Sequence, residues 1–273
     1  MIEKHEFKGE HDGLSLLVLA AVHGNETAGT QACRRIIDEI ERGALALKNG
    51  KMTLVPVCNP EAYRRDVRNI DENLNRVMTV HDNPRSYEQK LANEICPLIR
   101  EHRFTLDLHS THCVGDVPFA FCDYPDVYNQ KLIDALPVDF VLEGWPDIYG
   151  RQTEIRDFST EWCAHAYGNT ATTLECGYHR DPQAAELAYR AIVNALSAFG
   201  MVDLPLPAAR AKKHIRMENY VLKSKEGRLC RSYKHLDPVC KGERIALYDD
   251  GEALYALSDG FILLPNLQAP VNT

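Results

Sequence analysis

The sequence has no Cys-x-x-Cys pair and no hydrophobic run long enough to cross a membrane. Without closely spaced cysteine pairs a zinc ribbon is excluded, and the odd total of nine cysteines argues against a disulfide scaffold. The longest apolar run, residues 14–22, is much shorter than the roughly 20 residues of a membrane helix. We therefore expect reduced, mostly buried thiols in a cytoplasmic protein without a membrane partner.

Several common catalytic and binding motifs are also missing. The chain contains no Gly-x-Ser-x-Gly elbow, Ser-x-x-Lys pair, P-loop, Gly-x-Gly-x-x-Gly turn or His-Glu-x-x-His helix. A formal net charge of -8 argues against nucleic acid as a partner, although a few local arginines can still bind an anionic small molecule. Residues 1–13 are polar, and we expect no secretory leader there.

Strand-like and helix-like segments alternate up to about residue 200, which predicts an α/β fold. We expect a mostly parallel or mixed central sheet with helices on both faces, as residues 1–203, followed by a small all-β domain, as residues 204–273. Strands are predicted at 14–22, 52–58, 104–109, 117–122, 138–142 and 171–176. Helices are predicted at 26–41, 86–101, 126–135, 158–167 and 183–199.

Residues suited to binding a metal stand at the ends of two predicted strands. His23 and Glu26 follow the first strand, and His109 ends the third. The carboxyl ends of the strands build the sites of open α/β sheets, so these side chains are expected to converge. A catalytic zinc uses three protein ligands and keeps one open position. We interpret His23, Glu26 and His109 as the ligands of one Zn²⁺ per chain.

Other polar residues could complete a hydrolytic site. Glu175, near the end of the last strand, would act as the general base and later protonate the leaving amine. Arg68, in a loop, would polarise the scissile carbonyl and stabilise the oxyanion. Asn75 and Arg76 would bind a substrate carboxylate, with the guanidinium allowing a bidentate contact.

Simpler roles are open for some of these residues. Arg68 and Arg76 could instead be solvated loop charges. His112 is a rival metal ligand, although it suits a pocket or loop position better. Asp107 shares its side of the strand with His109 and could accept a hydrogen bond from a ligand histidine.

Four motifs carry a family resemblance. They are, in chain order, His-Gly-Asn-Glu (23–26), Asn-Arg (75–76), Asp-Leu-His-Ser (107–110) and Glu-x-Gly (175–177). This set resembles the succinylglutamate desuccinylase/aspartoacylase family, a branch of the zinc carboxypeptidase superfamily whose members also carry a C-terminal β domain. The resemblance implies zinc-dependent cleavage of N-acyl amino acids to a carboxylic acid and a free amino acid. It also implies the residue roles given above.

One position departs from the family pattern. Where the family has Asp-Leu-Asn-Arg, this chain has asparagine first, Asn73. The family's aspartate supports a zinc-bound histidine, and an amide oxygen can accept the same hydrogen bond without contributing charge. Zinc could therefore be bound more weakly, or Asp71 or Asp107 could compensate. Aspartoacylases also use an arginine shortly before the catalytic glutamate, whereas residues 165–174 contain none; Arg151 or Arg156 could replace it.

The functional hypothesis is a zinc-dependent amidohydrolase for small-molecule N-acyl amino acids. One alternative is a zinc carboxypeptidase or amidase that acts on short peptides with the same metal and glutamate. Another is a non-catalytic zinc-binding relative that has kept the ligands. An assembly of several identical copies is left open.

Overall fold

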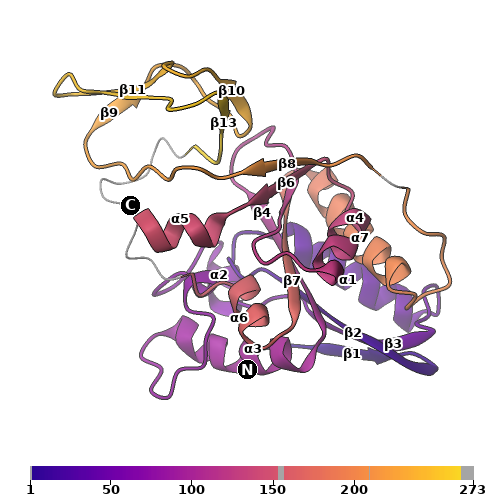
Figure 1. Ribbon diagram of the computed structural model, residues 1–273. Helices are drawn as coiled ribbons and strands as arrows, with labels where there is room; N and C mark the ends of the chain where they lie inside the picture. The colour runs from indigo at the N-terminus through magenta and orange to yellow at the C-terminus, as the bar shows by residue number, and fades with distance from the viewer. Residues whose placement is uncertain (1, 153–156, 209, 266–273) are drawn as a thin grey trace. The chain divides into compact units, whose positions relative to one another are not determined.

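A mixed sheet forms the centre of the larger of two units (Figure 1). The computed structural model describes residues 2–152, 157–208 and 210–265. The strands lie in the order β1 (His5–Lys8), β3 (Asn49–Val55), β2 (His11–Ala20), β4 (Phe104–Thr111), β7 (Thr170–Tyr178), β5 (Phe119–Phe121), β6 (Phe140–Glu143) and β8 (Lys213–Arg216). Neighbours are parallel except for the pairs β1–β3 and β5–β7.

Helices pack on both faces of this sheet (Figure 1). One core contains residues of α1 (Ala28–Glu41), α4 (Val127–Ala135) and α7 (Pro182–Ala198). The other contains residues of α3 (Tyr87–Glu101) and α6 (Thr160–Ala166). Two shorter helices follow strands: α2 (Pro60–Arg65) comes after β3, and α5 (Trp145–Gln152) comes after β6. The 3₁₀ helix η1 (Leu74–Arg76) lies between α2 and α3.

The side chains of β2 explain why both faces are covered. Leu16 and Val18 belong to the core with α1 and α7, whereas Leu17 and Leu19 belong to the core with α3. All four are fully buried. Side chains alternate between the two faces of a strand, so an uninterrupted apolar run needs a helical layer on each side.

The smaller unit consists of Cys113–Val117 and the described part of Asn219–Thr273. Its strands are β9 (Gly227–Leu229), β10 (Asp237–Val239), β11 (Arg244–Tyr248), β12 (Ala253–Tyr255) and β13 (Gly260–Ile262). They form an antiparallel three-stranded sheet, β12-β11-β9, and an antiparallel pair, β10-β13. Tyr233, Val239 and Ile245 are the buried residues of its small core.

The fold class expected from the sequence is confirmed. The bounds of the larger unit and of one strand differ from those expected. The larger unit continues to Glu218, beyond the boundary expected after residue 203, because β8 pairs with β6 in the central sheet. The strand expected at 52–58 lies at Asn49–Val55 instead. Pro56 has no N–H to donate to a sheet, and the Asn59 side chain caps α2 shortly afterwards.

Packing of α1 against the sheet predicts the effect of an alanine at Gly29. Helix propensity alone favours alanine by up to about 1 kcal/mol. However, a Cβ at Gly29 would lie 2.7 Å from the Leu108 Cβ and 2.8 Å from the Ala20 Cβ. Overpacking costs about 1–3 kcal/mol, so we expect Gly29→Ala to lower the free energy of unfolding by about 1–2 kcal/mol in urea titrations.

Gly150 in α5 provides the matched control, because a Cβ there would meet no atom of the described residues within 4 Å. Gly150→Ala should leave stability unchanged or raise it by up to about 1 kcal/mol. An unfolding free energy for Gly29→Ala equal to or above that of the wild type would contradict the packing argument.

Candidate metal centre

The turn after β2 places two candidate ligands side by side. His23 and Glu26 are 3% and 4% exposed, and the Glu26 N–H donates to the His23 carbonyl oxygen at 3.1 Å. A Cβ at Gly24, between them, would lie 2.1 Å from the Ala62 carbonyl carbon in α2. Glycine is therefore required at this position of the His-Gly-Asn-Glu motif, because the α2 backbone passes too close for any side chain.

His109 reaches the same place from the neighbouring strand. Strand β4 pairs in parallel with β2, with Leu108 opposite Ala20, so His109 lies at the same edge of the sheet as the turn that follows β2. Its side chain is 2% exposed. The structure thus brings together the three predicted ligands, as convergence at the carboxyl ends of parallel strands requires.

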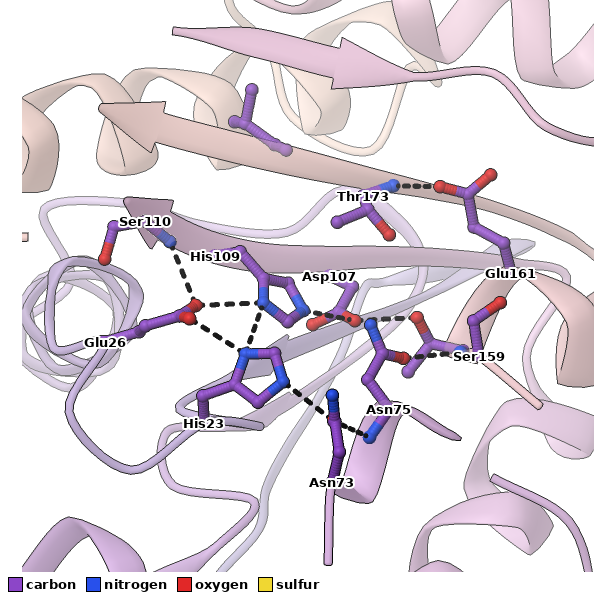
Figure 2. Close-up of polar contacts among 12 residues, drawn as sticks. His23, Glu26, Asn73, Asn75, Asp107, His109, Ser110, Ser159, Glu161 and Thr173 are labelled. Carbon is purple, nitrogen blue, oxygen red and sulfur yellow. Dashed lines mark hydrogen bonds and ion pairs between the residues drawn. The ribbon is translucent and has the colours of Figure 1, made fainter. Parts of the chain in front are cut away.

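The potential ligand atoms of these three residues converge (Figure 2). His23 Nδ1 lies 2.8 Å from Glu26 Oε1, and His109 Nδ1 lies 2.9 Å from Glu26 Oε2. The two Nδ1 atoms are 3.1 Å apart. Two nitrogens bound tetrahedrally to one zinc at about 2.0–2.1 Å would be about 3.3 Å apart, so the observed spacing fits shared coordination.

The outer nitrogens of both imidazoles make separate contacts. His23 Nε2 lies 3.0 Å from Asn73 Oδ1, which also accepts the Asn75 backbone N–H at 2.9 Å. This second bond identifies the Asn73 atom as the oxygen, so His23 Nε2 must be the donor. His109 Nε2 donates to Asp107 Oδ2 at 2.9 Å. These contacts turn the Nδ1 of each histidine toward the centre, as a hydrogen bond to the other ring nitrogen does for metal-bound histidines.

The converging groups need a positive charge between them. Two inward Nδ1 atoms and a carboxylate are all acceptors unless a proton or a metal ion lies between them. Burial lowers the pKa of His23 to about 4, which keeps that ring neutral. Burial also disfavours the charged form of His109, but the charges of Asp107 and Glu26 outweigh it and raise the pKa of His109 well above its usual value. The donor set therefore fits a divalent cation.

Hydrogen bonds outside the centre connect the two histidines (Figure 2). Thr160 links the two sides: its Oγ1 donates to Asp107 Oδ2 at 2.6 Å, and its N–H donates to Asn75 Oδ1 at 2.9 Å. The chain of contacts runs through His23, Asn73, Asn75, Thr160, Asp107 and His109. No sequence motif indicated Thr160, whose only local signal is its place directly after the cap residue of α6.

Glu175 lies beside the centre on β7. It pairs in register with His109 on β4, so the two side chains leave the sheet on the same side. Its Oε2 is buried and has no hydrogen-bond partner among the described residues. Burial and the negative charge of Glu26 raise the pKa of Glu175 to about 8. Glu175 is thus a carboxyl group next to the candidate ligands, with one oxygen that makes no hydrogen bond to a described residue.

Arg68 contacts the centre from its solvent side. Its Nη1 donates to Glu26 Oε1 at 2.9 Å, while its side chain is 52% exposed. The Arg68 carbonyl oxygen accepts the Gly24 N–H at 3.0 Å, which ties its backbone to the ligand-bearing turn. Arg68 is therefore paired with a candidate ligand and not with a neighbouring loop carboxylate.

Asn75 and Arg76 lie in η1, but their side chains already have partners. Asn75 is buried, and its Oδ1 is used by Thr160. Arg76 donates to the Tyr149 hydroxyl at 3.0 Å, and its guanidinium lies 5.1 and 5.8 Å from the ring centroids of Tyr149 and Trp145 in α5. Neither α5 nor these aromatic contacts were predicted from the sequence.

The remaining candidates lie outside this group. His112 is exposed, and the only cluster of three or more potential metal ligands found in the described part of the chain is His23, Glu26 and His109. Arg156 and the side chain of Arg151 lie outside the described residues. No helix within residues 2–152, 157–208 or 210–265 combines the length and hydrophobicity of a membrane-spanning segment.

Comparisons with known proteins identify relatives. A succinylglutamate desuccinylase of Vibrio vulnificus strain YJ016 is 26% identical over 200 residues, covering 70% of this chain and 55% of that protein. The desuccinylase of Photorhabdus laumondii is 24% identical over 290 residues, covering 95% of this chain and 84% of that protein. Some matches therefore span only about half of the relative's length.

Solved structures share the fold. The succinylglutamate desuccinylase/aspartoacylase of Rhodobacter sphaeroides has a TM-score of 0.74 at 19% identity, covering 96% of this chain and 83% of that one. The family model for the succinylglutamate desuccinylase/aspartoacylase catalytic domain matches residues 12–198, the span that carries every residue of the centre described above. The chain therefore belongs to the succinylglutamate desuccinylase/aspartoacylase family.

Proposed function

We propose that the chain is a zinc-dependent hydrolase that cleaves the amide bond of small N-acyl amino acids. The observation that carries this proposal is the convergence of two Nδ1 atoms and a carboxylate beside a glutamate with one oxygen that makes no hydrogen bond to a described residue. His23, Glu26 and His109 would hold one Zn²⁺. When bound, zinc supplies a Lewis acid that makes water a better nucleophile and polarises the substrate carbonyl.

Glu175 is the proposed general base and acid. It is not needed as a ligand, and its buried Oε2 lacks a hydrogen-bond partner in the described structure. It would take a proton from the attacking water as the new C–O bond forms, and deliver it to the amine nitrogen as the C–N bond breaks. One amide and one water thus give one carboxylic acid and one free amino group.

Arginines have the two other proposed roles. Arg68 is half exposed beside Glu26, where its guanidinium can stabilise the oxyanion that develops on the substrate carbonyl. Arg76, held by Tyr149, would bind the substrate carboxylate together with Asn75. Because Asn75 Oδ1 already accepts the Thr160 N–H, only the amide NH₂ of Asn75 is suited to such a contact.

The cysteines are consistent with a reducing compartment. All nine lie in the described part of the chain and are free thiols, most of them buried. Burial raises the pKa of the Cys33 thiol to about 12, which keeps it protonated and unreactive. We propose that the enzyme works in the cytoplasm.

The function is tested by measuring zinc content and then screening N-acyl amino acids for released amine. We expect one zinc per chain and turnover of at least one short N-acyl amino acid. Glu175→Gln should retain the zinc and lose about 10²–10⁴-fold in kcat, because it removes proton transfer but no ligand. Glu186→Gln, at an exposed ion pair on α7, serves as the control with unchanged kcat. Loss of zinc in Glu175→Gln would mean that Glu175 is a ligand.

Thr160 offers a test of the hydrogen bonds around the centre. Thr160→Val keeps the shape and removes the Oγ1 donor to Asp107, so the His109 partner is held less firmly. We expect zinc affinity, measured by competition with a chelator, to fall by about tenfold. Thr160→Ser keeps the donor and should bind zinc like the wild type. Equal affinity of all three proteins would show that this bond does not support the centre.

Arg76→Lys tests the proposed carboxylate contact. Lysine keeps the charge but loses the planar, bidentate donor geometry and the stacking on Tyr149. We expect KM for N-acyl amino acids to rise about tenfold with a smaller change in kcat, measured by steady-state kinetics. If kcat falls while KM stays constant, Arg76 acts in the chemical step and not in binding.

A further inference from the structure

A fully buried carboxylate outside the centre organises the loop that carries Arg68 and Asn73. Glu88, in the first turn of α3, is 0% exposed and is neither a candidate ligand nor a substrate contact. Burying a carboxylate is costly unless hydrogen bonds replace its water. The bonds that Glu88 accepts therefore indicate what it does.

Three consecutive backbone N–H groups point at Glu88. Ile70 donates to Oε1 at 2.7 Å, and Asp71 and Glu72 donate to Oε2 at 3.1 and 3.2 Å. Successive N–H groups turned toward one anion form a nest, a concave anion-binding arrangement of the backbone. A fourth donor, Asn59 Nδ2, completes the set at 3.1 Å. Asn59 also caps α2, so Glu88 joins α3, α2 and the loop.

Side chains of the loop in turn accept hydrogen bonds from the first turn of α3 and its cap residue. Asp71 Oδ2 accepts the Tyr87 N–H at 2.7 Å, and Glu72 Oε1 accepts from Gln89 Nε2 at 3.0 Å and from the Ser86 hydroxyl. Residues 70–72 are thereby fixed to the first turn of α3 from both sides. Asp71, considered from the sequence as a substitute for the missing family aspartate, is thus occupied at the helix.

Functional contacts lie directly on either side of this anchored segment. Two residues before it, Arg68 contacts Glu26, and one residue after it, Asn73 contacts His23. Because Asn73 carries no charge, it can support His23 only through a well-placed hydrogen bond. We propose that Glu88 is a positioning residue that places Asn73, and with it the His23 ring, for metal binding. This inference rests on the proposed function.

The test compares Glu88→Gln with the wild type. A glutamine is neutral and has a single acceptor oxygen, and its NH₂ group would face N–H donors. The nest therefore loses the negative charge and one of its two acceptors. We expect zinc affinity, measured with Zn²⁺ alone by chelator competition, to fall about 10–100-fold. Amide hydrogen exchange at Ile70, Asp71 and Glu72 should accelerate. In the cobalt-substituted protein, the visible absorption bands should shift as the His23 ligand moves.

Two controls separate positioning from general destabilisation. Glu101→Gln removes a charge from the exposed end of the same helix and should leave zinc affinity unchanged. Asn73→Ala removes the contact through which Glu88 is inferred to act. If the inference is correct, the affinity losses of Glu88→Gln and Asn73→Ala do not add in the double variant. Additive losses, or wild-type affinity in Glu88→Gln, would overturn it.

Glu88→Asp keeps the experiment decisive if Glu88→Gln does not fold. Aspartate keeps the negative charge, but its side chain is one methylene shorter and holds the carboxylate farther from the N–H groups. We therefore expect faster amide exchange at residues 70–72 than in the wild type, and a smaller loss of zinc affinity than in Glu88→Gln. Unchanged exchange and affinity in this variant would also overturn the inference. If the wild type binds no zinc, the proposed function fails, whereas exchange at residues 70–72 still tests the anchoring by Glu88.

Discussion

The structure of the site depends on placing three acceptor groups where they would repel one another without a cation. His23 and His109 direct Nδ1 atoms toward each other at 3.1 Å, and Glu26 adds its carboxylate. Arg68 neutralises Glu26 from outside, but the two facing Nδ1 atoms still need a proton or a metal ion between them. The parallel pairing of β2 with β4, the glycine after His23 and the close passage of α2 all serve to hold these groups together.

The protein holds its two candidate histidine ligands by different means. His109 has a fully buried carboxylate partner, Asp107, which supplies charge as well as orientation. His23 has only the neutral amide of Asn73, whose position is set through the loop and the carboxylate of Glu88. Negative charge is therefore present on one side of the centre and replaced by rigid placement on the other.

Sequence reasoning succeeded where local pattern determines structure. Apolar strands followed by polar residues predicted the sheet and the convergence of His23, Glu26 and His109, because parallel strands end at one edge. It did not reach Thr160 or Glu88, since their roles come from contacts between segments distant in the chain. Helix α5 was missed as well, and with it the contact of Tyr149 with Arg76. Propensity and periodicity carry no information about such long-range contacts.

We propose that one metal ion is bound between His23, Glu26 and His109 through the Nδ1 atoms of both histidines. X-ray diffraction from crystals grown with zinc, recorded on both sides of the zinc absorption edge, tests it most directly. We expect one strong anomalous peak per chain among these three side chains, with Asn73 and Asp107 still hydrogen-bonded to the Nε2 atoms. A peak at another place, coordination through Nε2, or no peak in zinc-saturated crystals would contradict it.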